Sequence, residues 1–273
     1  MSNKSTPLIF QDFSIAGIRK QWEYQQYQAG KLPALQEFYT INGFDTIGCK
    51  TETRRTRGLD KIDPDMWECK YEPEHEGTLI RTNLKDNSET LTNKIFPAGA
   101  YCIPKQQDKW NIETYIKCPY GKIGDEIWVK EAYDDGFIDI NGVENFAYKA
   151  NVDNPEWLLG HEEYKKRKWK NPMFMPKRIS RIKLDITGLS IERLHDITEE
   201  GAIREGITGT RLPSLLGGGM VYHNQVQYVS ALDTEDSAID AFNRTWINLH
   251  GQESWNKNPW VWVIQFTVKE LKQ

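Results

Sequence analysis

One short segment of the chain combines an amine, a carboxylate, two hydroxyls and two guanidiniums, and it reads Lys50-Thr51-Glu52-Thr53-Arg54-Arg55. Donors at this density are costly to bury without partners, and together they suit a ligand that is anionic or carries carbonyl groups. A solvated charged loop has the same composition. The segment by itself therefore leaves both interpretations open.

Five further segments follow in chain order: Cys118–Glu131 (CPYGKIGDEIWVKE), Tyr148–Ala150 (YKA), Met175–Ile182 (MPKRISRI), Asp196–Gly206 (DITEEGAIREG) and Asn258–Phe266 (NPWVWVIQF). Taken in this order after residues 50–55, they resemble the motifs of the ASCH-domain family, in particular its longer phage and prophage members. The resemblance spans roughly residues 47–268, with unmatched stretches between the segments.

The resemblance implies a fold and a domain organisation. ASCH domains are PUA-like, so we expect the α+β class: a small mixed β-barrel with flanking helices and long loop insertions. The whole chain, residues 1–273, would form a single ASCH/PUA-like domain with insertions at about 57–117, 134–172 and 207–233.

The resemblance also implies site residues. One branch of the family consists of acetylcytidine amidohydrolases, whose site combines a Lys, a Thr and a Glu; the matching positions are Lys50, Thr53 and Glu205. Arg55 matches the Arg that follows in the same motif. The candidate ligand-binding residues from the matched segments are Thr51, Arg54, Arg55, Trp128, Lys177 and Arg178.

These residue types are compatible with amide hydrolysis. Thr53 could attack an amide carbonyl if a base accepted its proton, and Lys50 could be that base if burial and neighbouring guanidiniums lowered its pKa. Glu205 could return a proton to the leaving amine, and Arg55 could stabilise the oxyanion. The same side chains could instead hold a nucleobase, since a carboxylate accepts from an exocyclic amine and a cation donates to a carbonyl.

Three functions therefore remain open. The first is binding of RNA, another single-stranded nucleic acid or a modified nucleoside, with residues 50–55 lining the cleft. The second is an amidohydrolase acting on acetylated cytidine or a similar nucleoside. The third is a non-enzymatic phage interaction or structural protein in which the motifs serve only the fold. The long insertions favour a macromolecular ligand, whereas the net charge of −4 opposes it.

Composition indicates a soluble globular protein, because 27% of the 273 residues are charged and 38% are apolar. The sequence has no apolar run of membrane-spanning length and no signal-peptide core at its N-terminus. We therefore expect a location in the bacterial host cytoplasm and no membrane partner. One or two of the 10 Trp residues could stack on a base, although most should fill the core.

The cysteines and histidines suggest no cofactor and no metal. Cys49, Cys69, Cys102 and Cys118 lie far apart without a CxxC pair, so a disulfide framework is not expected in a reducing cytosol. A zinc site that combines cysteines with His75 is disfavoured, because structural zinc ligands usually come in close pairs. The spacing of the remaining histidines suggests neither a metal site nor a catalytic triad: His195, His223 and His250.

Local patterns predict the main elements. Helices are expected at 14–29, 198–206 and 234–250, starting at Ser14, Thr198 and Thr234. Strands are expected at 126–131, 179–194 and 260–268, all in one sheet system, with a bulge or bend at Gly188.

Two stretches are expected to be irregular. Residues 207–233, with Gly217-Gly218-Gly219, suggest a flexible loop that could act as a lid. The basic run at 165–170 around Trp169 is either a solvated face or a phosphate-contacting patch.

Overall fold

The structure is a computed structural model of the chain. It describes residues 5–10, 12–29, 50–73, 75–82, 89–96, 99–105, 114–134, 137–138, 144–149, 168–211, 220–224 and 235–272. Within these ranges, no helix is long and apolar enough to cross a membrane.

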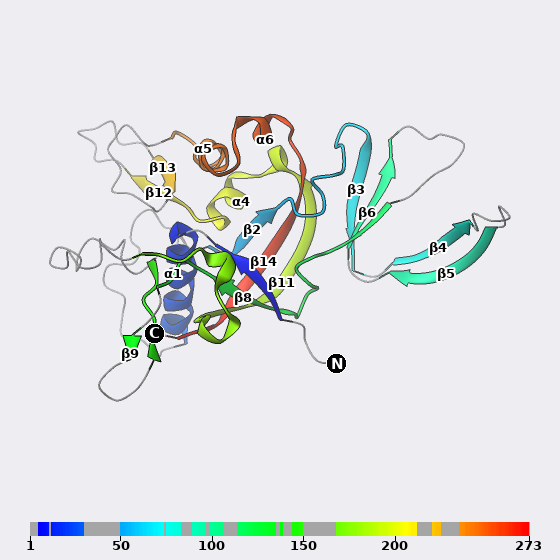
Figure 1. The fold of residues 1–273 in the computed structure, drawn as a ribbon. Coiled ribbons are helices and arrows are strands. Elements are labelled where there is room, and N and C mark those ends of the chain that lie inside the picture. Colours follow the sequence, from blue (N-terminus) through cyan, green and yellow to red (C-terminus); the bar gives the residue numbers. More distant parts are fainter. Residues whose placement is uncertain are drawn as a thin grey trace.

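A five-stranded sheet organises the molecule (Figure 1). Its strands, in spatial order, are β1 (Ser5–Ile9), β8 (Glu126–Lys130), β11 (Ile182–Arg193), β14 (Trp260–Leu271) and β2 (Glu52–Arg55). β1 pairs with β8 in parallel, and the other neighbours are antiparallel. The expected strands at 126–131, 179–194 and 260–268 thus share one sheet, and the register of β11 against β14 shifts between Ile186 and Gly188, where the bulge was predicted.

The α+β class is confirmed, but the described strands do not close into the expected small barrel. β1 and β2 each have one neighbour and form the two edges of the sheet. The open edge at β2 presents backbone N–H and C=O groups without a strand partner, so another element of the molecule must form hydrogen bonds with them.

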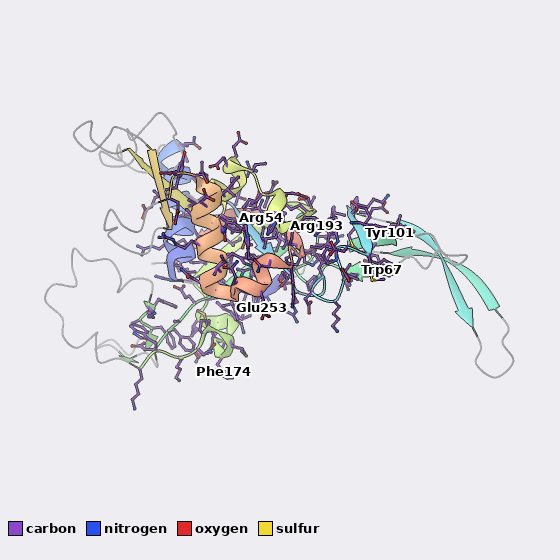
Figure 2. The ribbon with its side chains drawn as sticks, turned by 90° about the horizontal axis from the view of Figure 1, so that it is seen from above. Arg54, Trp67, Tyr101, Phe174, Arg193 and Glu253 are labelled. Carbon is purple, nitrogen blue, oxygen red and sulfur yellow. A yellow bond between two sulfur atoms is a disulfide. The ribbon has the colours of Figure 1, made fainter. Side chains whose placement is uncertain are left out.

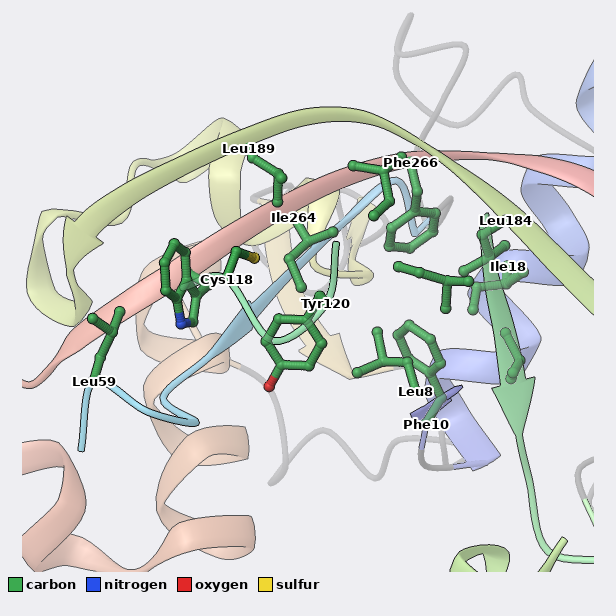
Figure 3. Packing of buried hydrophobic residues seen from close by; sticks show 14 of the residues in the cluster. Leu8, Phe10, Ile18, Leu59, Cys118, Tyr120, Leu184, Leu189, Ile264 and Phe266 are labelled. Carbon is green, nitrogen blue, oxygen red and sulfur yellow. The ribbon is translucent and has the colours of Figure 1, made fainter. Parts of the chain in front are cut away.

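Both faces of β14 are buried, which explains its nearly continuous apolar sequence. Residues such as Trp262, Ile264 and Phe266 belong to one core cluster, whereas Val261 and Val263 belong to a second. Helix α1 (Asp12–Gln28) covers the first cluster with Ile15 and Ile18, and Gln21 donates from Nε2 to the carbonyl of Phe266. Figure 3 shows β11 and β14 curving over this cluster.

The second cluster lies under three helices: α4 (Glu199–Arg204), α5 (Ala238–His250) and α6 (Gln252–Asn256). Phe242 and Trp246 pack from α5 against Val261 and Val263 of the sheet. These helices gather on one side of the sheet in Figure 1. Because α4 and α5 lie next to the β2 edge, they can build a site there.

The helix ends follow the capping rules, with two differences from expectation. Thr198 caps α4 as predicted, since its Oγ1 accepts from Gly201 N–H at 3.0 Å. The predicted start at Thr234 is wrong: α5 begins after Ser237, whose hydroxyl accepts from Asp240 N–H at 3.0 Å. The predicted start at Ser14 is also late, because α1 already includes Asp12.

The stretch expected to be a loop at 207–233 contains a hairpin. β12 (Ile207–Arg211) pairs antiparallel with β13 (Met220–Asn224), and Tyr222 forms a further bridge to Glu235. The prediction missed this pairing because it depends on non-local register. The Gly217–Gly219 triplet and the possible lid lie outside the described residues.

The expected insertion at 57–117 forms a second group of strands. β3 (Trp67–Glu72), β6 (Gly99–Pro104) and β7 (Thr114–Lys117) make a three-stranded sheet, and β4 (His75–Thr82) pairs with β5 (Glu89–Phe96). Figure 1 shows the β4–β5 hairpin extending away from the main sheet.

One expectation about cysteines is overturned in this second group. Cys69 and Cys102 are bonded as a disulfide, although no disulfide was expected. The two residues lie directly opposite each other on antiparallel β3 and β6, with Cα atoms 4.1 Å apart. The chain separation of 33 residues hides this proximity from sequence inspection.

The remaining described elements are short. β9 (Phe137–Ile138) pairs with β10 (Glu144–Asn145), and three 3₁₀ turns, η2 (Pro172–Phe174), η3 (Lys177–Ile179) and η4 (Leu194–Asp196), flank β11. Much of the basic run at 165–170 lies outside the described residues. Lys168 and Lys170, which are described, are exposed.

Candidate functional site

The site is organised by the way residues 50–55 cross between the sheet and α4. Thr51 N–H donates to the carbonyl of Arg204 at the end of α4, and Thr51 O accepts from Phe266 N–H of β14, both at 2.9 Å. These two bonds tie the start of the segment to both neighbours. Lys50 consequently lies inside the molecule, with only 2% of its surface exposed.

Lys50 and Glu205 form a buried ion pair. Lys50 Nζ donates to Glu205 Oε2 and to the Glu205 backbone carbonyl, each at 2.5 Å. Glu205 is in position because α4 ends there: the next residue, Gly206, has a φ of +102°, which turns the chain out of the helix.

The other carboxylate oxygen of Glu205 binds the sheet edge. Oε1 accepts from the backbone N–H of Arg54, which points away from β14, and it lies 3.5 Å from Arg54 Nη1. The side chain at the C-terminal end of α4, that of Glu205, therefore satisfies the outward-facing amide of β2 and also pairs with Lys50. This double contact fixes the carboxylate relative to the strand.

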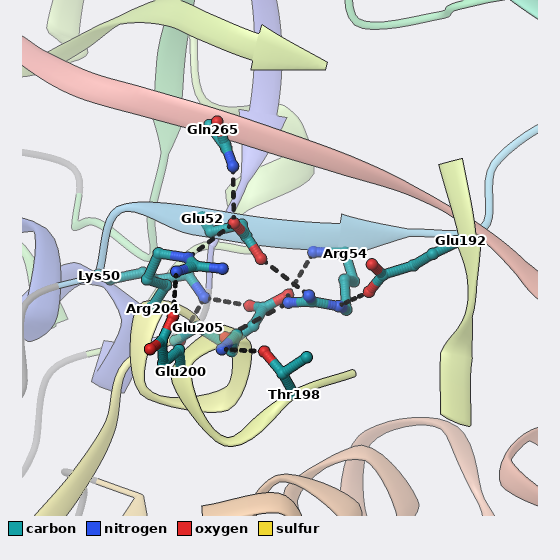
Figure 4. A network of polar contacts seen from close by, with 10 residues as sticks. Lys50, Glu52, Arg54, Glu192, Thr198, Glu200, Arg204, Glu205 and Gln265 are labelled. Carbon is teal, nitrogen blue, oxygen red and sulfur yellow. Dashed lines mark hydrogen bonds and ion pairs between the residues drawn. The ribbon is translucent and has the colours of Figure 1, made fainter. Parts of the chain in front are cut away.

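Arg54 is the centre of a wider buried network (Figure 4). Its guanidinium pairs with Glu52 Oε1 at 2.8 Å and donates from Nε to Glu192 Oε1 at 2.6 Å. Glu52 Oε2 in turn accepts from Arg204 Nε at 3.0 Å and Gln265 Nε2 at 3.2 Å. Burial lowers the pKa of Arg54, but the surrounding carboxylates outweigh it and the net pKa is raised, so this guanidinium stays charged.

Burial has the opposite net effect on Lys50. Loss of hydration lowers the pKa of its ammonium, Glu205 counteracts that loss in part, and the charges of Arg55 and Arg54 add to the lowering. Burial also disfavours the charged form of Glu192, and it raises the pKa of that carboxyl despite the bond to Arg54. Lys50 is therefore closer to losing its proton than a surface lysine.

A pocket opens between the β2 edge and α5. Lys50, Thr53, Arg55 and Glu205 line it on one side, and α5 supplies Phe242, Thr245, Trp246, Leu249 and His250 on the other. Its volume is about 50 Å³, which is room for a small group and not for a nucleobase.

A second, larger pocket of about 360 Å³ adjoins the first. The two share Arg54, Arg55, Trp246 and His250, and the second adds Thr56, Arg57, Asp60 and Tyr120. We call the smaller the inner pocket, the larger the outer pocket, and both together the cleft. The outer pocket lies in the size range of small-molecule sites.

The structure brings together most of the residues singled out in the sequence. Lys50, Thr53, Arg54, Arg55 and Glu205 all line the inner pocket. Thr51 follows Lys50 in the chain and is not among the residues that line this pocket. Its bonds to Arg204 and Phe266 are made by its backbone and not by its side chain.

Three candidate ligand contacts lie elsewhere. Trp128 is on β8, 8% exposed, with Lys130 Nζ 5.1 Å from its ring centroid. Lys177 and Arg178 are exposed on η3, with the Arg178 guanidinium over Phe146. None of the three is among the described residues that line the cleft.

Several cleft residues were missed in the sequence. The helix that carries Phe242 and Trp246 was predicted, and one or two Trp residues were expected to stack on a base, but neither residue was assigned to the site. The His250 ring lies 4.4 Å from that of Trp246, and partial burial of the imidazole together with the charge of Arg55 lowers its pKa. Tyr120 lines the outer pocket and directly follows Cys118-Pro119 in one of the matched segments, so its position in that segment could have identified it as a site residue.

No cluster of three or more potential metal ligands occurs within the described ranges. Comparisons with protein-family models, with curated proteins and with solved structures found no match. The function is therefore inferred from the geometry of the cleft and from the residues that line it.

Proposed function

We propose that this chain binds single-stranded nucleic acid, most simply RNA, or a modified nucleoside in the cleft between β2 and α5. The observation that carries the proposal is the convergence of Lys50, Thr53, Arg55 and Glu205 on one pocket beside the aromatic face of α5. The resemblance to PUA-like ASCH proteins of phages supports the same proposal, with α4, α5 and the β2 edge as the binding surface.

The cleft offers groups that suit a nucleobase. Two of the three N–H donors of Lys50 go to Glu205, so a third remains for a base carbonyl. Each Glu205 oxygen retains lone-pair capacity for an exocyclic amine. His250, whose ring packs on Trp246, presents an aromatic surface on which a base can stack.

Fluorescence titration with labelled RNA and DNA oligomers at two salt concentrations tests this proposal. We expect affinity to fall as salt rises, because phosphate contacts release counterions. His250→Ala should weaken binding about tenfold or more, the usual size of one lost stacking contact. Asn248→Ala is the matched control, because Asn248 is exposed on the same helix and does not line the cleft.

The lowered pKa of Lys50 favours a second candidate, hydrolysis of an acylated nucleoside such as acetylcytidine. Thr53 Oγ would attack the acyl carbonyl while the Lys50 amine accepts its proton. The carbon–nitrogen bond would then break, with a proton delivered to the leaving amine through Glu205. Water would release acetate from Thr53.

The same variants separate binding from catalysis. Thr53→Ala should abolish acetate release, and Lys50→Arg should preserve binding but lose turnover, because arginine keeps the charge without acting as a base. Turnover that survives in Lys50→Arg would exclude Lys50 as the base. If neither binding nor turnover is found, both candidates fail and an interaction protein becomes the better interpretation.

A further inference from the structure

The outer pocket differs in charge from the inner one. Around the inner pocket, the cations of Lys50, Arg54 and Arg204 are matched by the carboxylates of Glu52, Glu192 and Glu205. The outer pocket shares Arg54 and Arg55 with the inner one and adds Arg57, against the single carboxylate of Asp60. Its wall therefore carries an excess of positive charge that the buried network does not neutralise.

Arg55 lines both pockets and has a hydrogen-bond donor that no described residue uses. Its Nη2 donates to the carbonyl of Ile9 at 2.9 Å, and its guanidinium lies 5.2 Å from the Phe10 ring centroid. Its Nε is buried and has no hydrogen-bond partner among the described residues. A buried donor without a partner is unfavourable, so an acceptor brought by a ligand would be favoured there.

Arg57 supplies an exposed guanidinium on a fixed backbone. Trp262 Nε1 donates to the Arg57 carbonyl at 3.1 Å, which holds the residue just beyond β2. Within the described part of the chain, its side chain forms no ion pair. Arginine suits phosphate because its planar guanidinium can donate two parallel hydrogen bonds.

Tyr120 adds a neutral donor to the same pocket. Burial raises the pKa of its hydroxyl to about 12, although Arg55 and Arg57 act to lower it. The hydroxyl therefore keeps its proton at neutral pH. Asp60 is the opposing group: its Oδ1 accepts from Gly58 N–H at 2.8 Å, and its charge repels an anion in the pocket.

We propose that the outer pocket is a phosphate subsite in which Arg55, Arg57 and Tyr120 hold the phosphate of a nucleotide. This inference rests on the proposed function, because the base of that nucleotide stacks on His250, which lines both pockets, and only its polar edge reaches into the inner pocket. The ligand is then a nucleotide or a nucleic-acid strand in preference to a free nucleoside.

Calorimetric titration of the full chain with cytidine, N4-acetylcytidine and their 3′- and 5′-monophosphates tests the subsite. At low salt, one of the monophosphates should bind at least tenfold more tightly than its nucleoside, as expected for charge-assisted hydrogen bonds. Arg57→Ala should remove most of this advantage, because it should weaken binding of the monophosphate far more than binding of the nucleoside. Asp60→Asn, which keeps an acceptor for Gly58, should increase the advantage.

Arg244→Ala is the charge-matched control, because Arg244 is on α5 and does not line the cleft. Equal affinity for nucleosides and monophosphates would overturn the subsite and leave the proposed function standing. The subsite would also be overturned if Arg57→Ala weakened the binding of nucleosides and of monophosphates equally. If neither these ligands nor the oligomers bind, the proposed function falls and the subsite falls with it.

Discussion

At the scale of single residues, burial decides what a side chain can do. Lys50 and Arg54 are both cationic and both buried, yet the pKa of Lys50 is lowered and that of Arg54 is raised. The difference lies in their partners: one carboxylate beside Lys50, three around Arg54. A base is therefore conceivable at Lys50, whereas Arg54 acts as the fixed centre of the network.

Cys118 provides a prediction at this scale. Its thiol is buried, which raises its pKa from 9.0 to about 11. Between these values the unfolded chain loses the proton first, so the unfolded state binds fewer protons and the free energy of unfolding falls as pH rises. By pH 10.5 this one group should lower that free energy by about 2 kcal/mol.

Urea unfolding at pH 7.5 and pH 10.5 measures the effect. Cys118→Ala should lose less stability over this pH interval than the wild-type chain, whatever the cost of the substitution itself. Comparing the pH dependence of the two proteins separates Cys118 from Tyr120, whose raised pKa acts in the same direction. An identical pH dependence in both proteins would contradict the prediction.

At the scale of elements, the end of the short helix α4 determines the geometry of the site. α4 stops at Arg204, so Glu205 faces Lys50 and the edge of β2, and Gly206 turns the chain into β12. The cap at Thr198 fixes the other end. Geometry at both ends of α4 therefore controls where the Glu205 carboxylate lies.

Gly206→Ala tests this control. Its φ of +102° is strained for alanine, so the variant should lose about 1–2 kcal/mol of unfolding free energy. Relief of the strain should also shift Glu205 and weaken oligomer binding. Gly124→Ala is the matched control: its φ is +87°, an added Cβ would meet open space, and it should lose similar stability without losing binding. Equal binding by the two variants would show that α4 does not position the site through Gly206.

At the scale of the whole molecule, the disulfide and the cleft lie in different parts of the fold. Cys69–Cys102 joins β3 to β6, whereas the cleft lies between β2 and α5. In Figure 2, Arg54 lies near the helices, and Trp67 and Tyr101 lie toward the β4–β5 hairpin. We therefore expect the disulfide to support stability and not ligand binding.

Reduction of the disulfide provides the corresponding prediction. For cysteines 33 residues apart, loop-closure entropy predicts a loss of about 3–4 kcal/mol of unfolding free energy on reduction. Urea unfolding with and without dithiothreitol measures this loss, and oligomer titration under both conditions should give equal affinities. The double variant Cys69→Ala/Cys102→Ala should show no further response to the reductant. A reductant-dependent affinity in the wild-type chain would mean that the two parts of the fold are coupled.

The sequence by itself determined the features that depend on near neighbours along the chain. Alternating and continuous apolar runs located β8, β11 and β14, the small residue Gly188 marked the bulge, and Thr198 marked the start of α4. The local density of donors at residues 50–55 also drew attention to Lys50, Thr53 and Arg55. These signals are local, so no knowledge of pairing was needed to read them.

Only the tertiary structure decided which distant residues meet. The pairing of β12 with β13, the Cys69–Cys102 bond and the open edge at β2 all depend on register between separated segments. The same is true of the contribution of α5 to the cleft and of the separation of Trp128, Lys177 and Arg178 from it. Residue types fix which bonds a side chain can form, but burial and partners fix which ones it does form, and both arise only when the chain folds.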